Sequence, residues 1–184
     1  MCEALRRLRE EGTVAHVGLG MTCNDEAHQG VPQEIVRLLR QAPRGTFDSA
    51  LLAGGWNLLS QAGAPCYAEC ERAGVEVYVA GVFASGLLVG GETYAYLKAP
   101  PALVERAQRW RTLAAKHGHS LPAVAIAFAA LPRCVSRVVL GMASAEQVEA
   151  NMAWVAESAS VRPALWAEAQ ATGLLAADVP IPYK

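Results

Sequence analysis

Apolar and polar positions along the chain fall into blocks with two different periods, which predicts alternating helices and strands. Apolar residues three or four apart indicate the buried face of a helix, whereas short apolar runs closed by glycine or proline indicate strands. Helices are expected over residues 1–12, 31–42, 64–73, 101–118 and 120–132, from 144, and near 163. Strands are expected over residues 13–20, 47–53, 75–83 and 136–141, with loops or turns over 24–30, 54–63 and 84–100.

The predicted strands are continuous apolar runs, and they alternate with helices along the chain. Both features are typical of a parallel sheet covered by helices in an α/β fold. A doubly wound sheet and half of an eight-stranded α/β barrel both fit this order. A complete barrel needs about 250 residues, which is more than the 184 of this chain. We therefore expect a single domain over residues 1–184.

Composition and charge exclude several classes of protein. Hydrophobic residues make up 53% of the chain and charged residues 18%, which supports a core and argues against disorder. The net charge is −1 and no basic run exceeds Arg6-Arg7, so no nucleic-acid partner is expected. No apolar run has membrane-spanning length, so no membrane partner is expected either. The charged helical N-terminus does not resemble a signal peptide, which predicts a cytoplasmic protein.

Cysteines and histidines offer no obvious chemical centre. The five cysteines are odd in number and irregularly spaced, which fits reduced thiols rather than a disulfide framework. Cys66 and Cys70 lie four apart on a predicted helix, but a zinc site needs further ligands and no paired His/Cys motif supplies them. We expect both to be buried or half-buried and expect no metal site. His16, inside a predicted strand, is expected to be a core residue.

The stretch VVLGMASAEQVEANM, residues 138–152, combines a strand end with a helix start. Gly141 would stand at the carboxyl edge of the sheet, where α/β folds bind ligands. Ser144 is a good N-cap and forms a capping-box pattern with Gln147, and the free N–H groups of this turn favour an anion. Gln147 and Asn151 could together bind a heterocycle such as adenine, or the helix could simply be capped with a solvated polar side. The apolar stripe of this helix, expected to face the core, is Val148, Met152 and Val155.

The segment FASGLLVGGETYAY, residues 83–96, is a second candidate for ligand binding. It leaves the most strongly predicted strand, and long glycine-rich loops at strand ends are common sites of function. Ser85 and Gly86 could offer a hydroxyl and backbone N–H groups to a phosphate. The alternative is a flexible surface loop.

Five segments together, in order and spacing, resemble the aldo/keto reductases, and in particular the group that acts on sugars. They are EALRRLREEGTVAHVGLG, FDSALLAGGWNLLSQ, ECERAGVEVYVAGVFASGLLVGG, AAKHGHSLPAVAIAFAALP and VVLGMASAEQVEANM. The resemblance implies an (α/β)8 barrel that binds a nicotinamide cofactor without a Rossmann fold. It places this chain as the C-terminal half, strands five to eight, so that residues 1–184 form a partial domain. The family's catalytic Asp, Tyr, Lys and His belong to the first four strands, so no catalytic residue is expected here.

The resemblance also implies which residues bind the cofactor. The position that is often a cation for the 2′-phosphate of NADP corresponds to Ala143, so NAD is expected at least as much as NADP. The implied contacts are Thr22 at the nicotinamide, Ser85, Gly86 and Leu87 along the pyrophosphate, and Gly141, Ser144, Gln147 and Asn151 around the adenine end.

Two functions remain as expectations. The first is an oxidoreductase that moves hydride between NAD(P) and a sugar or aldehyde substrate, seen here as a truncated chain that is inactive alone. The second is a non-catalytic α/β module that binds a dinucleotide or associates with itself. Self-association is expected through open sheet edges, because half a barrel leaves two of them unpaired.

Overall fold

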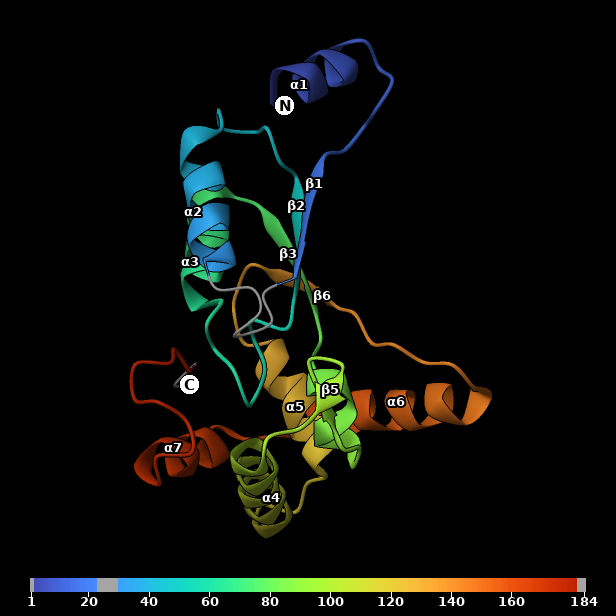
Figure 1. Cartoon of the computed structure of the whole chain (residues 1–184), viewed down its shortest axis with the longest axis vertical. Helices are drawn as coiled ribbons and strands as arrows, with labels where there is room; N and C mark the ends of the chain where they lie inside the picture. The colour runs from blue at the N-terminus through green and yellow to red at the C-terminus, as the bar shows by residue number, and fades with distance from the viewer. Residues whose placement is uncertain (1, 23–29, 182–184) are drawn as a thin grey trace.

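The structure is a computed structural model, and it describes residues 2–22 and 30–181. Its centre is a four-stranded sheet whose neighbouring strands are all parallel, in the order β1-β2-β3-β6 (Figure 1). This arrangement confirms the predicted parallel α/β fold. The strands of this sheet are β1 (Gly18–Thr22), β2 (Ser49–Ala53), β3 (Glu76–Ala80) and β6 (Val135–Val138).

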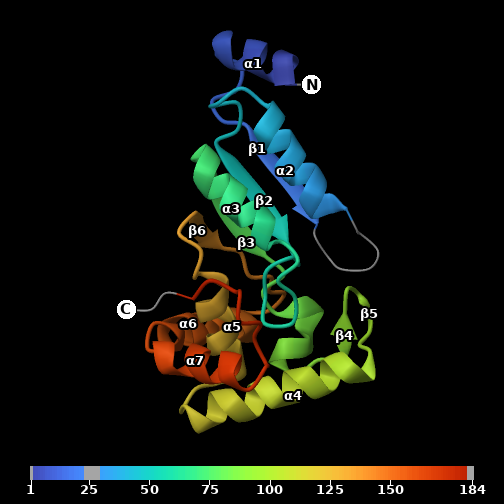
Figure 2. The same cartoon turned by 90° about the vertical axis from the view of Figure 1, so that its left-hand side faces the viewer.

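Seven α-helices are present in the described residues, and all occupy predicted helical segments. Helices α2 and α3 cover one face of the sheet, while α4, α5, α6 and α7 gather beyond its carboxyl end (Figure 2). No helix in residues 2–22 and 30–181 has the length and apolarity to cross a membrane. The helices are α1 (Cys2–Glu10), α2 (Val31–Gln41), α3 (Ala64–Ala73), α4 (Pro101–Lys116), α5 (Leu121–Ala129), α6 (Ala145–Ser158) and α7 (Pro163–Ala171).

Local sequence explains where helices begin and end. Proline stands at the first or second position of helices α2, α3, α4, α5 and α7. Backbone N–H groups in the first turn have no acceptor within the helix, so proline, which lacks this N–H, costs no hydrogen bond there. Helix α3 ends at Gly74, whose φ of 72° is left-handed and favours glycine. The Gly74 N–H closes the helix on the carbonyls of Cys70 and Glu71. The predicted stop at Gly74 is therefore confirmed.

The core extends from the space between the sheet and helices α2 and α3 into the helices beyond the carboxyl end of the sheet. Cys66 and Cys70 of α3 are fully buried, which confirms their prediction as core residues. Below the sheet, the turn-rich segment 54–63 is tied to the helices by two indoles. The Trp110 Nε1–H donates to the Leu58 carbonyl at 3.0 Å, and the Trp56 ring stacks on Phe128 at 4.9 Å.

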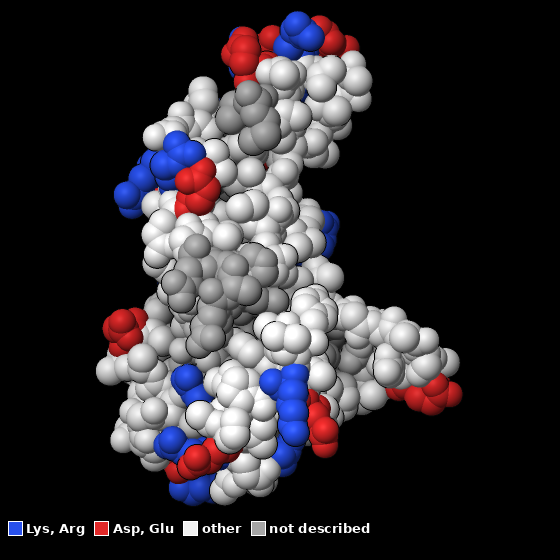
Figure 3. All heavy atoms as spheres, viewed as in Figure 1, with Lys and Arg blue, Asp and Glu red and all other residues white. Residues whose placement is uncertain are grey.

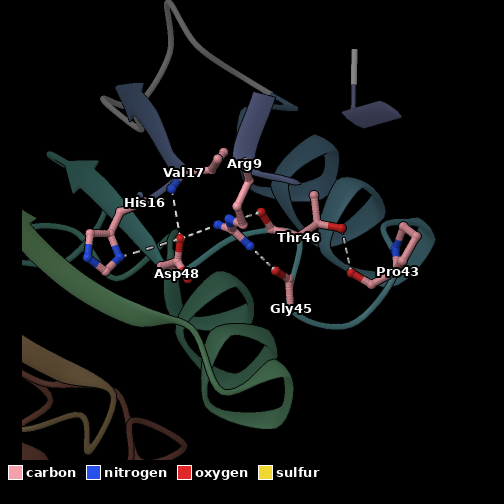
Figure 4. Close-up of polar contacts among 7 residues, drawn as sticks. All are labelled: Arg9, His16, Val17, Pro43, Gly45, Thr46 and Asp48. Atoms are coloured by element: carbon pink, nitrogen blue, oxygen red, sulfur yellow. Dashed lines mark hydrogen bonds and ion pairs between the residues drawn. The ribbon is translucent and has the colours of Figure 1, made fainter. Parts of the chain in front are cut away.

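Strand β1 starts later than predicted, and the prediction for His16 was wrong. The strand begins at Gly18 rather than at residue 13, and the His16 side chain is 83% exposed. The cause is a side-chain clasp (Figure 4). The Asp48 carboxylate accepts a hydrogen bond from the Val17 N–H at 2.7 Å and pairs with Arg9, while the Asp48 N–H donates to the Val17 carbonyl at 2.8 Å. Arg9 also donates to the Gly45 carbonyl at 2.6 Å, which links the end of α1 to the turn before β2.

The segment predicted as a loop over residues 84–100 contains regular structure. It holds a 3₁₀ segment, η2 (Ala84–Val89), and a hairpin of β4 (Thr93–Tyr94) with β5 (Leu97–Lys98). Ala95 and Tyr96 at the hairpin tip both have positive φ, as tight two-residue hairpins require. Ala and Tyr are not the usual residues there, so turn chemistry did not reveal the hairpin. Most of the polar loop predicted over residues 24–30 lies outside the described residues.

Candidate functional site

A cleft of about 470 Å³ lies at the carboxyl end of β3 and β6. Three segments line it: residues 81–89 after β3, residues 139–141 after β6, and the first three turns of α6. Parallel α/β sheets bind ligands at this edge, because loops and helix N-termini converge there. A larger cavity beside α4 and α7 lies away from this edge and is lined by Arg106, Arg109 and Glu105 of α4 together with small residues that follow α7.

The first wall of the cleft has an unusual backbone. Ala84, Ser85 and Gly86 are consecutive and all have positive φ, at 49°, 56° and 100°. Each of the two non-glycine residues in this region costs on the order of 1–3 kcal/mol. Two contacts hold the turn: the Thr93 hydroxyl donates to the Ser85 carbonyl at 2.5 Å, and the Gly91 N–H donates to the Gly86 carbonyl at 2.9 Å. Such strain, kept in place by surrounding contacts and facing a cleft, points to a functional constraint.

The second wall starts at the N-terminus of α6, where the predicted cap forms. The Ser144 hydroxyl accepts a hydrogen bond from the Gln147 N–H at 3.3 Å. The return bond of the predicted capping box is displaced by one residue, because Gln147 Oε1 accepts from the N–H of Ala143 at 2.6 Å rather than from that of Ser144. This bond occupies the oxygen of the Gln147 amide and leaves its NH₂ group for other partners.

Asn151 stands one helical turn deeper and is 5% exposed. Its Nδ2 lies 3.5 Å from the Gly141 carbonyl, so it links α6 to the loop after β6. Strand β6 ends at Val138, earlier than the predicted end at Gly141, and pairing continues only to the Val139 N–H. A Cβ on Gly141 would meet no atom within 4 Å, so contacts with the described residues do not require glycine there.

The predicted orientation of α6 was wrong. Val148, Met152 and Val155, expected in the core, are 42%, 63% and 41% exposed. The helix packs on α5 through the side that carries Asn151 and Trp154, and the apolar stripe meets no covering element in the described residues. The spacing correctly indicated an apolar face on this helix. The face that packs on α5, however, is the adjacent one, which carries Asn151 and Trp154.

The far end of α6 is anchored to the start of α5. The Glu157 carboxylate accepts hydrogen bonds from the Ser120 N–H at 2.6 Å and from the Ser120 hydroxyl at 2.7 Å. Burial by itself would raise the pKa of Glu157, but these bonds and nearby His119 outweigh it and hold the pKa below its ordinary value.

Glu146 is the single charged residue among those that line the cleft. A hydrogen bond from the Ser144 hydroxyl, together with a backbone hydrogen bond, lowers the pKa of this carboxyl. The lining contains neither lysine nor arginine, so an anion in the cleft would depend on backbone N–H groups at the start of α6, one of which already pairs with the Glu146 carboxylate.

The structure brings five of the eight predicted cofactor residues together in the cleft lining: Ser85, Gly86, Gly141, Gln147 and Asn151. The other three lie elsewhere. The Leu87 side chain is 3% exposed within the core, and Ser144 caps α6 beside the cleft. Thr22 ends β1, which is separated from β3 by β2.

Sequence reasoning missed two aromatic residues of the lining. Phe83 and Trp154 pack edge to face, with ring centroids 5.7 Å apart, and so join the two walls of the cleft. Trp154 lies three residues beyond Asn151 and therefore on the same helical side, which was the available signal. No group of three potential metal ligands occurs in residues 2–22 and 30–181.

The fold and cleft define a class: a parallel α/β protein with a ligand cleft at the carboxyl edge of its sheet. Within that class, the sequence model of the aldo/keto reductase family matches residues 1–160. The chain belongs to this family of oxidoreductases.

Two characterised relatives are similar over most of the chain. A pyridoxal 4-dehydrogenase of Microbacterium luteolum is 29% identical over 178 residues, which cover 94% of this chain and 48% of that protein. A D-threo-aldose 1-dehydrogenase of a Pseudomonas species is 30% identical over 171 residues, which cover 90% of this chain and 48% of that protein. The chain thus spans about half the length of these relatives.

Solved structures of the family have the same fold. An aldo-keto reductase of Bacillus halodurans, in its holo form, superposes with a TM-score of 0.66 at 22% identity, over 97% of this chain and 56% of that one. A glycerol dehydrogenase of Gluconobacter oxydans gives a TM-score of 0.63 at 16% identity, over 100% of this chain and 55% of that one. At these identities the likeness speaks for the fold alone.

Proposed function

We propose that the cleft binds the adenosine and pyrophosphate part of a nicotinamide dinucleotide. The observation that carries the proposal is the convergence of two features on one cleft. One is the strained turn at Ser85 and Gly86. The other is the amide pair Gln147 and Asn151 near Gly141, where a Cβ would meet no atom within 4 Å. Amide side chains pair with the donors and acceptors of adenine, while N–H groups at a helix start favour phosphate.

We further propose that NAD is preferred over NADP. A 2′-phosphate is usually bound by a cation, and the cleft lining contains none. Ala143, at the position where the family often has a cation, is exposed, and Glu146 nearby would repel a second anion. Introducing Ala143→Arg should therefore raise NADPH affinity, while NADH affinity should change less than twofold. Equal gains for both cofactors would contradict this assignment.

In the reaction, the bound nicotinamide would supply or accept hydride, and this chain would hold the cofactor in place. We propose that the chain corresponds to strands five to eight of the family barrel and that the family's Asp, Tyr, Lys and His belong to the complementary half. The substrate would be a sugar or another aldehyde, as the names of the two dehydrogenases suggest. The 184 residues alone should then bind cofactor without turnover.

Calorimetric titration with NADH, NADPH and ADP tests the binding step. We expect NADH and ADP to bind with a Kd on the order of 1 mM or below, equivalent to about −4 kcal/mol. Asn151→Ala should weaken both, since it removes the link to the Gly141 carbonyl as well as an adenine contact. Gln170→Ala, at a partly buried position of α7 outside the cleft, is the control. Absence of binding at millimolar NADH and ADP would refute the proposed site.

A second measurement separates the enzyme from a non-catalytic dinucleotide-binding module. NADH formation from NAD and an aldose is followed at saturating cofactor, with a no-protein control. The rate of NADH formation with the isolated chain should equal that of the no-protein control. A higher rate would disprove the proposal that the catalytic residues belong to the half with the first four strands. Recovery of activity on mixing with a polypeptide that supplies the first four strands would favour the enzyme over the module.

A further inference from the structure

A second, smaller hollow lies at the amino end of the sheet, between the C-terminal ends of α2 and α3 (Figure 2). Its volume is about 180 Å³, below the range of about 300–1,000 Å³ typical of sites for larger organic ligands. Both helices and the loop that joins α2 to β2 belong to this chain, so the hollow is formed by elements that are neighbours in the fold. Its lining consists of residues 39, 40, 42–47, 72, 73 and 75.

Three arginines stand around this hollow. Arg40 lies in the last turn of α2, Arg72 lies in the last turn of α3, and Arg44 lies in the loop that follows α2. Basic side chains gather over the upper part of α2 in the space-filling view (Figure 3). The whole chain has a net charge of −1, so the positive charge at this place is a local concentration.

A buried carboxylate orients two of the three guanidinium groups. The Glu69 side chain is 5% exposed, and it accepts hydrogen bonds from Arg40 Nε at 3.0 Å and from Arg72 Nε at 2.7 Å. The bonds from Arg72, together with those from Arg40, outweigh burial and hold the pKa of Glu69 below its ordinary value. The side chains of Arg40 and Arg72 are 66% and 63% exposed. Among the described residues, the two Nη groups of Arg40 have no acceptor, so they are available to a ligand.

The backbone that carries Arg44 is fixed, although its side chain makes no hydrogen bond or ion pair within the part of the chain that the structure describes. The Thr46 N–H and hydroxyl both donate to the Pro43 carbonyl, at 3.1 and 2.6 Å, which closes a tight turn with Arg44 at its second position. Gly45 at the third position has a φ of 82°, as type II turns require. Arg9 donates to the Gly45 carbonyl at 2.6 Å and holds the turn from its other side (Figure 4).

Stabilisation of helix ends explains only part of this arrangement. Cations in the last turn of a helix interact favourably with its dipole, and Arg40 and Arg72 both have that position. Arg44 lies beyond the end of α2, so the dipole does not account for it. Together the three guanidinium groups and the Glu69 carboxylate leave two positive charges. A phosphate monoester carries a charge of about −1.5 to −2 at pH 7, and the planar fork of arginine matches its oxygens.

We propose that this hollow binds a phosphate group with two negative charges, either as free phosphate or as the monoester of a small organic molecule. Arg40 and Arg44 donate to the phosphate oxygens, while Glu69 keeps the guanidinium groups of Arg40 and Arg72 in place. The site is separate from the cleft that we assign to the dinucleotide, because the two lie at opposite ends of the sheet. Its ligand joins α2 to α3 and stabilises the folded chain by mass action.

Calorimetric titration at low salt with inorganic phosphate, glucose 6-phosphate and acetate tests this proposal. Both phosphates should bind with a Kd on the order of 1 mM or below, and acetate, with a single charge, should bind at least tenfold more weakly. Arg44→Gln should weaken phosphate binding at least tenfold, because it removes charge-assisted hydrogen bonds. Arg44→Lys keeps the charge without the fork and should lose less affinity than Arg44→Gln. Arg111→Gln is the matched control, since Arg111 is an exposed arginine of α4 outside the hollow.

The same titrations distinguish this site from the cleft. Asn151→Ala, which alters the cleft, should leave phosphate affinity unchanged, so each proposal can fail without the other. Absence of phosphate binding to the unmodified chain overturns the inference. Phosphate binding that persists in Arg44→Gln, or that is equally weakened in Arg111→Gln, also overturns it. If the site is present, tighter binding of glucose 6-phosphate than of inorganic phosphate identifies a monoester as the ligand, and equal or weaker binding identifies free phosphate. Far-UV circular dichroism verifies that each variant is folded.

Discussion

Gly141→Ala should affect stability and ligand binding in opposite directions. A Cβ at this position meets no atom within 4 Å, and its φ lies outside the left-handed region. Alanine therefore fits the folded backbone and removes freedom from the unfolded chain, which should stabilise the fold by about 0.4–1 kcal/mol. For a domain of this size that gain raises the melting temperature by roughly 1–4 °C.

The same methyl group projects into the cleft that we assign to the dinucleotide. If the cofactor backbone approaches Gly141 closely, the methyl group takes the place of ligand atoms, and affinity for ADP should fall at least tenfold, or by about 1.4 kcal/mol. Calorimetry with ADP measures the loss, and urea unfolding followed by circular dichroism measures the gain. Gly20→Ala is the control, because its Cβ is equally unobstructed but lies on β1, away from the cleft. Unchanged ADP affinity in Gly141→Ala would refute the close approach.

Two further substitutions test contacts outside the cleft. The pKa of Glu157 is lower in the folded state, so its contribution to stability is complete above the unfolded pKa, near 4.5, and is lost as the pH falls through the folded value. Ser120→Ala should therefore lower the free energy of unfolding at neutral pH by about 1 kcal/mol. The variant should also lose less stability than the unmodified chain as the pH falls below 4.5, which urea unfolding at several pH values measures. An equal loss of stability in acid for both proteins would contradict this linkage. Trp110→Phe should cost about 1–3 kcal/mol because it leaves the buried Leu58 carbonyl without its indole donor, and a change in unfolding free energy below about 0.5 kcal/mol would show that water replaces the donor.

Elements with strong local signals were predictable from the sequence. Proline at helix starts and Gly74 at the end of α3 fixed helix positions to within a few residues. The cap at Ser144 followed from the capping-box spacing, and the placement of Gln147 and Asn151 beside Gly141 followed from the resemblance to the aldo/keto reductases. The proline, glycine and serine signals depend on backbone groups within a few residues of one another, which a sequence records directly.

Features set by distant contacts were not predictable. The start of β1 depends on Asp48, which lies about thirty residues further along the chain and takes the Val17 N–H as its partner. The outward stripe of α6 depends on which helical side meets α5, and Met152 and Asn151 are adjacent in sequence yet 63% and 5% exposed. Periodicity identifies an apolar face, but the surrounding elements decide whether that face is covered.

Helix α6 is held near its C-terminal end by the Glu157 bonds to Ser120, and in its third turn by the Asn151 contact with the Gly141 carbonyl. The helix lines the cleft over its first three turns, while the bonds to Ser120 hold its opposite end. A helix of 14 residues spans about 21 Å, so a small rotation at the anchor becomes a larger displacement at Gln147. If the cleft binds the dinucleotide proposed above, its affinity should therefore respond to acid and to substitution of Ser120, which lies outside the cleft lining.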